Sequence, residues 1–221
     1  ISKCCHDIDF LLWLTRTRCH KLTSFGSLRW FHSANAPKGS ADRCIDCSVE
    51  NDCPFSAVKL YRERREWIAN FDVPEGKTIE YQLHVGIYGR CVYHCDNDVV
   101  DHQIVSMEME SEVTINFSMD VFTLKDNRET HICLTEGEID GDETTLRVKR
   151  FCGREETVYD FSDIAGTPFH AGADLALMED FIEAVRSSKK SLATAIDVSV
   201  ESHLICYEAE RSRREERIIV F

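Results

Sequence analysis

The sequence predicts an α+β fold: a largely antiparallel, open sheet with helices packed on one face. Strand-like segments with a two-residue hydrophobic period are bunched in the middle of the chain, and apolar residues at helical spacing lie near both ends. No Gly-x-Gly-x-x-Gly motif follows a strand-like segment, which argues against a dinucleotide-binding parallel sheet. With 221 residues, we expect one domain spanning 1–221.

The first third of the chain alternates regular segments with a long loop. A helix is predicted over 6–14, opening on an acidic first turn, and a strand over 19–31. Residues 32–53 contain Pro and Gly and predict a loop, after which 56–71 predict a helix with a charged face. Residues 77–88 fit either a helix or a strand.

The central segments predict an antiparallel hairpin with one buried and one polar face. Apolar and polar residues alternate over 105–109 and again over 113–121. The strand pattern continues over 129–135, 144–151 and 155–161, with a turn expected at Asp140-Gly141-Asp142. Because the helices suffice for only one face, we expect the other face, with Thr114, Asn116 and Ser118, to mediate homo-oligomer formation.

Two amphipathic helices are predicted near the end of the chain. Leu175, Met178, Phe181, Ile182 and Val185 form one apolar stripe over 174–187. A second helix is predicted over 195–211, behind the capping-box pattern Thr194-x-x-Asp197.

Charge and cysteine content restrict the class of protein. The 26 Lys and Arg residues against 39 Asp and Glu residues give a net charge of −13, so nucleic acid is not an expected partner. No segment has the roughly 20 apolar residues that span a bilayer, and no signal peptide is expected, so no membrane partner is predicted. Eleven scattered cysteines predict reduced thiols in a cytoplasmic protein. We expect the chain to be the later part of a longer protein.

The residues Lys3, His6 and Asp9 form the first candidate site. At helical spacing, an ammonium group, an imidazole and a carboxylate can converge, and histidine is suited to proton transfer near neutral pH. The alternative is an ordinary helix start with a surface histidine. A second group could line a sugar pocket, although solvated turns and a helix cap explain it equally well: Asp96, Asp98, Asp101, His102, His170 and Asp174.

Several motifs, in order along the chain, resemble one branch of the Gfo/Idh/MocA oxidoreductases, specifically their C-terminal domain. His6-Asp7-Ile8-Asp9 opens this series. The series continues with Ser24-Phe25-Gly26-Ser27-Leu28, Asn35-Ala36-Pro37, Tyr88-Gly89-Arg90-Cys91-Val92-Tyr93, Asp96-Asn97-Asp98-Val99-Val100-Asp101-His102-Gln103, Thr135-Glu136-Gly137-Glu138-Ile139, His170-Ala171-Gly172-Ala173-Asp174 and Ser199-Val200-Glu201-Ser202-His203.

The resemblance implies an enzyme that oxidises or reduces a sugar, polyol or related hydroxy compound with NAD or NADP. The cofactor would be held by an N-terminal Rossmann domain that these residues lack, so the chain alone is expected to be inactive. His6 would be the acid/base, helped by Lys3 or by a lysine of the missing domain, with Asp9, Asp96, Asp98, His102 and His170 binding substrate. Ser2 stands where the inositol-dehydrogenase pattern has an aspartate. The alternatives are a non-catalytic domain that binds a sugar or a partner and is organised by zinc, or a pure oligomerisation module.

A cysteine group on the long loop is the candidate metal site. Cys44-x-x-Cys47 and Cys53 could supply three zinc ligands, with Cys91, Cys95 or Cys5 as the fourth. A CxxC with one trailing cysteine is also found as plain packed thiols. We favour that reading: the thiols lie close together without an obligatory metal, and packing of Phe55 holds the loop.

Overall fold

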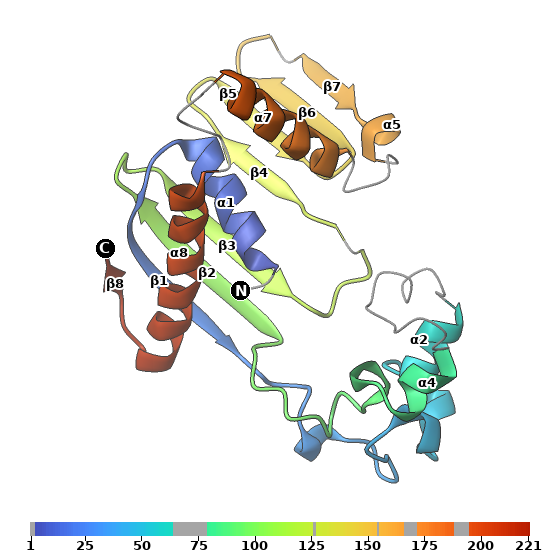
Figure 1. The fold of residues 1–221 in the computed structure, drawn as a ribbon. Helices are drawn as coiled ribbons and strands as arrows, with labels where there is room; N and C mark the ends of the chain where they lie inside the picture. The colour runs from blue at the N-terminus through green and yellow to red at the C-terminus, as the bar shows by residue number, and fades with distance from the viewer. Residues whose placement is uncertain (1–2, 64–78, 126, 154, 166–171, 188–194) are drawn as a thin grey trace. The chain divides into compact units, whose positions relative to one another are not determined.

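In the computed structural model, the described residues are 3–63, 79–125, 127–153, 155–165, 172–187 and 195–221. They form two compact units. Unit 1 combines residues 1–17 with 122–207, and unit 2 combines 18–121 with 208–221. The helices and antiparallel sheets confirm the α+β fold class, although the strands are divided between two open four-stranded sheets (Figure 1).

The sheet of unit 2 has the order β3-β2-β1-β8, with all neighbours antiparallel. Its strands are β1 (Cys19–Ser27), β2 (His102–Met109), β3 (Thr114–Asp120) and β8 (Ile219–Val220). The hairpin predicted from the alternating residues is β2–β3, and Ser106 pairs with Asn116 across it.

The two faces of this sheet differ as the alternation predicts. Leu22 pairs with Met107 across β1 and β2, Val105 lies on the same face, and all three are at most 4% exposed. On the opposite face Lys21 pairs with Glu108 through a 3.0 Å ion pair, and the Ser106 hydroxyl donates to Asn116 Oδ1 at 2.8 Å. The Thr114, Asn116 and Ser118 side chains lie exposed on this polar face.

Helix α8 (Ile196–Glu215) ends against β1. Within unit 2, the Ser24 backbone N–H donates to Ser212 Oγ at 3.1 Å, and the Ser212 hydroxyl donates to the Arg217 carbonyl at 2.6 Å. Ser212 is 1% exposed, so its hydroxyl satisfies a backbone donor that the sheet leaves unpaired. These bonds fix the turn that leads from α8 into β8.

Unit 1 contains helix α1 (Cys4–Thr15) and the second sheet, in the order β4-β5-β6-β7. Its strands are β4 (Thr130–Cys133), β5 (Gly137–Gly141), β6 (Thr145–Arg150) and β7 (Glu156–Asp160). Helices α5 (Ser162–Ala165) and α7 (Ala173–Ser187) follow. Among the helices of the described residues, none is both long and apolar enough to cross a bilayer.

The loop region of unit 2 folds around short helical turns: η1 (Ser33–Asn35), η2 (Cys44–Asp46), η3 (Glu50–Asp52), α2 (Ala57–Glu63), α4 (Ile79–His84) and η4 (Ile87–Gly89). A small core joins Cys44, Ala57, Val58, Tyr61 and Leu83. The Arg43 guanidinium donates to the carbonyls of Leu83 at 2.9 Å, Gln82 at 3.1 Å and Gly86 at 2.5 Å. This one side chain therefore satisfies the carbonyl end of α4.

Two expected elements have different bounds. The strand predicted over 19–31 ends at Ser27. The turn between β5 and β6 lies later in the sequence than the expected Asp140-Gly141-Asp142. Asp140 and Gly141 still belong to β5, and the turn follows them. In it, the Asp142 carboxylate accepts the backbone N–H groups of Thr144 and Thr145. Residues 64–71 of the predicted helix and Thr194 of the capping box lie outside the described residues.

Candidate functional site

Helix α1 presents the first candidate group at its start. Lys3 is the N-cap residue of α1 and is exposed, and His6 is exposed one turn later. Asp9 follows at the next i+3 position and is half-buried. The predicted helical spacing is therefore present, and Ile8 and Leu12 anchor the opposite side of the helix, at 3% and 8% exposure.

An ion-pair network that sequence reasoning missed lies beside this group in unit 1. Arg128 Nε donates to Asp7 Oδ1 at 2.5 Å, and its Nη1 donates to Glu143 at 2.8 Å. These two carboxylates raise the pKa of the Arg128 guanidinium. The network ties the first turn of α1 to the segment before β4. Because Asp7 and Arg128 are far apart in sequence, no local pattern indicates it.

The best-defined carboxylate–histidine pair is Asp101–His102, at the start of β2 in unit 2. Asp101 Oδ1 lies 2.8 Å from His102 Nδ1. Asp101 is only 2% exposed, and its Oδ2 accepts the backbone N–H groups of Trp30 at 2.6 Å and Phe31 at 3.4 Å. Burial acts to raise the pKa of Asp101, but N–H donors from Trp30, His102, Arg29 and Phe31 outweigh it, so the pKa falls to about 2.

This pairing gives His102 a defined orientation. A carboxylate that binds one ring nitrogen fixes the ring and its tautomer, leaving the other nitrogen for a ligand. The His102 side chain is 45% exposed, so its ring is accessible to solvent. The Trp30 loop is itself held, because Trp30 Nε1 donates to the Tyr93 hydroxyl at 3.2 Å and Asn35 Nδ2 donates to the Trp30 carbonyl at 3.0 Å.

The other predicted substrate residues have different surroundings. Arg90 binds Asp96 at 2.5 Å in an exposed turn, which lowers the pKa of Asp96, and Asp98 is exposed in the same turn. Asp174 lies in the first turn of α7, and His170 lies outside the described residues. Their roles in substrate binding stay predictions. The Lys3–His6–Asp9 group and the Asp101–His102 pair are each defined within their own unit.

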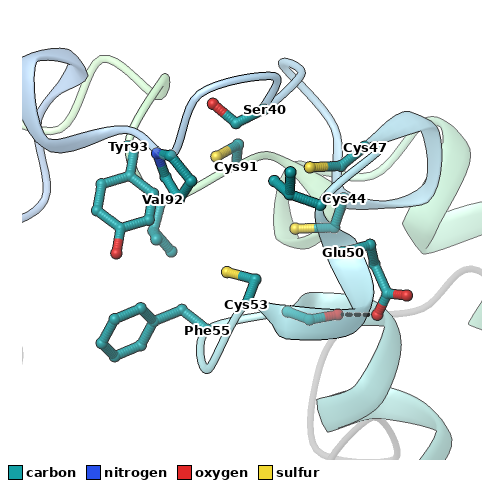
Figure 2. Close-up of a pocket in the computed structure, with 12 residues that line it drawn as sticks. Ser40, Cys44, Cys47, Glu50, Cys53, Phe55, Cys91, Val92 and Tyr93 are labelled. Atoms are coloured by element: carbon teal, nitrogen blue, oxygen red, sulfur yellow. Dashed lines mark hydrogen bonds between the residues drawn. The ribbon is translucent and has the colours of Figure 1, made fainter.

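The loop cysteines converge as expected, and a fourth joins them. Cys44, Cys47, Cys53 and Cys91 line one small cavity in unit 2, and Figure 2 shows their sulfur atoms turned toward it. We call these four residues the thiol cluster. Burial, followed by a smaller effect of neighbouring cysteines, raises the pKa of the Cys44 thiol, and burial raises that of Cys91. All eleven cysteines are free thiols.

The surroundings of the thiol cluster decide among the expected fourth residues. Within unit 2, Cys91 lines the cavity but Cys95 does not, and the Cys95 thiol donates to the Val92 carbonyl at 3.5 Å. Cys5 belongs to unit 1. The packing expected for Phe55 is confirmed: its ring lies 5.0 Å from that of Phe31 and 6.1 Å from that of Tyr93. As they stand, no three Cys, His, Asp or Glu side chains among the described residues are placed to hold one metal ion.

This α+β architecture is that of a domain found in oxidoreductases. Several solved structures that share this fold are oxidoreductases, which confirms at the level of the fold the resemblance to Gfo/Idh/MocA oxidoreductases expected from the sequence. The sequence itself matches no protein-family model and no curated protein.

Three structural neighbours illustrate the range. Aldose-aldose oxidoreductase from Caulobacter crescentus is 11% identical over 98% of this chain, with a TM-score of 0.55. UDP-N-acetylglucosamine 3-dehydrogenase from Acidithiobacillus ferrooxidans is 12% identical over 96% of it, with a TM-score of 0.53. The transcriptional regulator Gal80p from Kluyveromyces lactis is 14% identical over 99%, with a TM-score of 0.55. The chain spans 45%, 45% and 44% of these proteins, respectively.

Proposed function

We propose that these residues form the substrate-facing part of a cytoplasmic NAD(P)-dependent oxidoreductase that acts on a sugar, a polyol or a related hydroxy compound. The observation that carries the proposal is the fold: nearly the whole chain matches about 45% of sugar oxidoreductases such as the Caulobacter enzyme. The described residues offer no glycine-rich cradle for a dinucleotide, so the cofactor would be bound by a domain outside these 221 residues.

In this proposal His6 moves the proton of the reacting hydroxyl. The bound nicotinamide accepts or donates the hydride at the carbinol carbon. His6 is suited to this proton transfer because its side chain is exposed on the first turn of α1. The exposed Lys3 ammonium group at the N-cap would polarise the oxygen of the reacting hydroxyl. Asp9, in the same unit as His6, would hydrogen-bond another hydroxyl group of the substrate. The substrate-binding roles expected for Asp96, Asp98, His102 and His170 stay predictions.

The test is kinetic and uses the full-length protein with NAD+ or NADP+ and a panel of aldoses and polyols. His6→Ala should lower kcat by about 10²–10⁴-fold and leave the cofactor Kd unchanged, because positioned proton transfer contributes about that factor. His20→Ala, which removes an exposed histidine of β1, is the matched control. An unchanged kcat for His6→Ala would remove His6 from the mechanism.

A second candidate function is a non-catalytic domain that binds a sugar or a protein partner. The match to Gal80p favours it, because that neighbour is a transcriptional regulator rather than an oxidoreductase. The two candidates differ in one measurement. Sugar binding by the full-length protein without reduction of NAD+ or NADP+ in the presence of any panel member would support the second function.

A further inference from the structure

The thiol cluster is built by backbone contacts that join two distant segments. Arg43 and Arg90 form an isolated antiparallel bridge, and the Cys91 N–H donates to the Asp42 carbonyl at 2.8 Å. This pairing brings Cys91 beside Cys44. Cys47 follows η2, and Cys53 follows η3, so two single turns return the loop to the same cavity.

The cavity between the sulfur atoms suits a single ion. Its volume is about 10 Å³, which is the space of roughly one water molecule. The remaining lining includes the apolar Val49, Phe55 and Val92 and the polar Ser40, Glu50 and Ser56. Figure 2 shows Phe55, Val92, Ser40 and Glu50 around the four cysteines. A cavity of this size is too small for an organic ligand or a cluster of four irons, whereas one ion bound by the four sulfur atoms would fit.

The sequence alone favoured packed thiols without an obligatory metal, but a fourth cysteine at the same cavity changes that reading. We propose that Cys44, Cys47, Cys53 and Cys91 bind one structural Zn²⁺ in a tetrahedral four-thiolate site. Because no three of the side chains are at ligating positions as they stand, the sulfur atoms close inward on binding. Each thiol gives up its proton to solvent, so four protons leave and four Zn–S bonds of about 2.3 Å form. No oxidation or reduction is involved.

The local fold explains what the ion would contribute. The segment around the site consists of single turns and two short helices, α2 and α4, over a core of five buried residues. So small an apolar core supplies little stability, and small units of this kind are commonly held by a metal or by disulfides. A four-thiolate zinc site would join the two chain segments that the Arg43–Arg90 bridge pairs.

The test is elemental analysis of the full chain, purified without chelator from cells grown with zinc. We expect about one zinc per chain. Cys91→Ser and Cys47→Ser should each lose the metal, whereas Cys95→Ser should retain it, because Cys95 is close in sequence but does not line the cavity. If the first two variants fail to fold, Co²⁺ is substituted for Zn²⁺ in the wild-type protein. We then expect the visible absorption spectrum of a tetrahedral cobalt–thiolate site.

Three outcomes would overturn the proposal. They are a wild-type chain that holds no metal, zinc that remains after Cys91→Ser, and iron in place of zinc. A Cys44–Cys47 disulfide found by mass spectrometry of freshly purified protein would also contradict it. None of these outcomes bears on His6 or on oxidoreductase activity, so the zinc site and the proposed function stand or fall separately.

Discussion

Replacing Asp101 by Asn tests how the loop at Trp30 is held. The substitution keeps the size of the side chain but removes its charge. It also replaces one carboxylate oxygen by an NH₂ group, which cannot accept a hydrogen bond. That is unfavourable here because Trp30, Phe31 and His102 all hydrogen-bond the carboxylate. Because the side chain is 2% exposed, water cannot replace the lost contacts.

The magnitude follows from the pKa. The value of about 2 in the folded state, against 3.8 ordinarily, corresponds to about 2 kcal/mol of folding free energy. A folded-state pKa below the ordinary value means that this stabilisation is complete above pH 3.8 and is lost as the pH falls through about 2. Adding the mismatched amide, we expect Asp101→Asn to cost about 2–4 kcal/mol at neutral pH.

Urea unfolding at several pH values measures this cost. The difference between wild type and Asp101→Asn should be constant above about pH 4 and should shrink by about 2 kcal/mol toward pH 2. Asp98→Asn, in an exposed turn nearby in sequence, should stay within about 0.5 kcal/mol of wild type. If Asp101→Asn behaves like Asp98→Asn, or if its cost does not depend on pH, the reasoning is refuted.

Three further predictions concern other parts of the chain. Arg43→Ala should cost about 2–4 kcal/mol in urea unfolding, because it removes one hydrogen-bond donor from each of three carbonyls. Arg43→Lys should recover only part of this stability, and equal stability of the wild type and both variants would contradict the prediction. The 221-residue chain alone should not bind NAD(H), and micromolar binding in titration calorimetry would disprove this. Asn116→Arg should dissociate the homo-oligomer that we expect through the polar sheet face; light scattering that shows a monomeric wild-type, full-length protein would end that expectation.

Local sequence patterns predicted the parts of the fold that local physics determines. The alternation from Val105 to Val121 required one buried and one polar face, and the observed pairing of Ser106 with Asn116 follows from it. The spacing of Lys3, His6 and Asp9 likewise placed all three at successive turns at the start of α1.

The sequence-based predictions failed where residues far apart in the sequence form hydrogen bonds to the backbone. The first strand stops at Ser27 because the Asp101 carboxylate, far along the chain, binds the N–H groups of Trp30 and Phe31 that a longer strand would have used. The convergence of Cys91 with Cys44 depends in the same way on a backbone bridge between distant segments, so spacing alone left Cys91, Cys95 and Cys5 equivalent.

The pairing of β1 with β8 has a consequence for synthesis on the ribosome. Leu22 is made well before its partner Ile219, because almost the whole of this sequence separates the two residues. Until then one edge of β1 carries unpaired N–H and C=O groups, which can pair with another nascent chain. We therefore expect this sheet to be completed only after Ile219 has emerged from the ribosome, and chaperones that shield strand edges to matter most before that point.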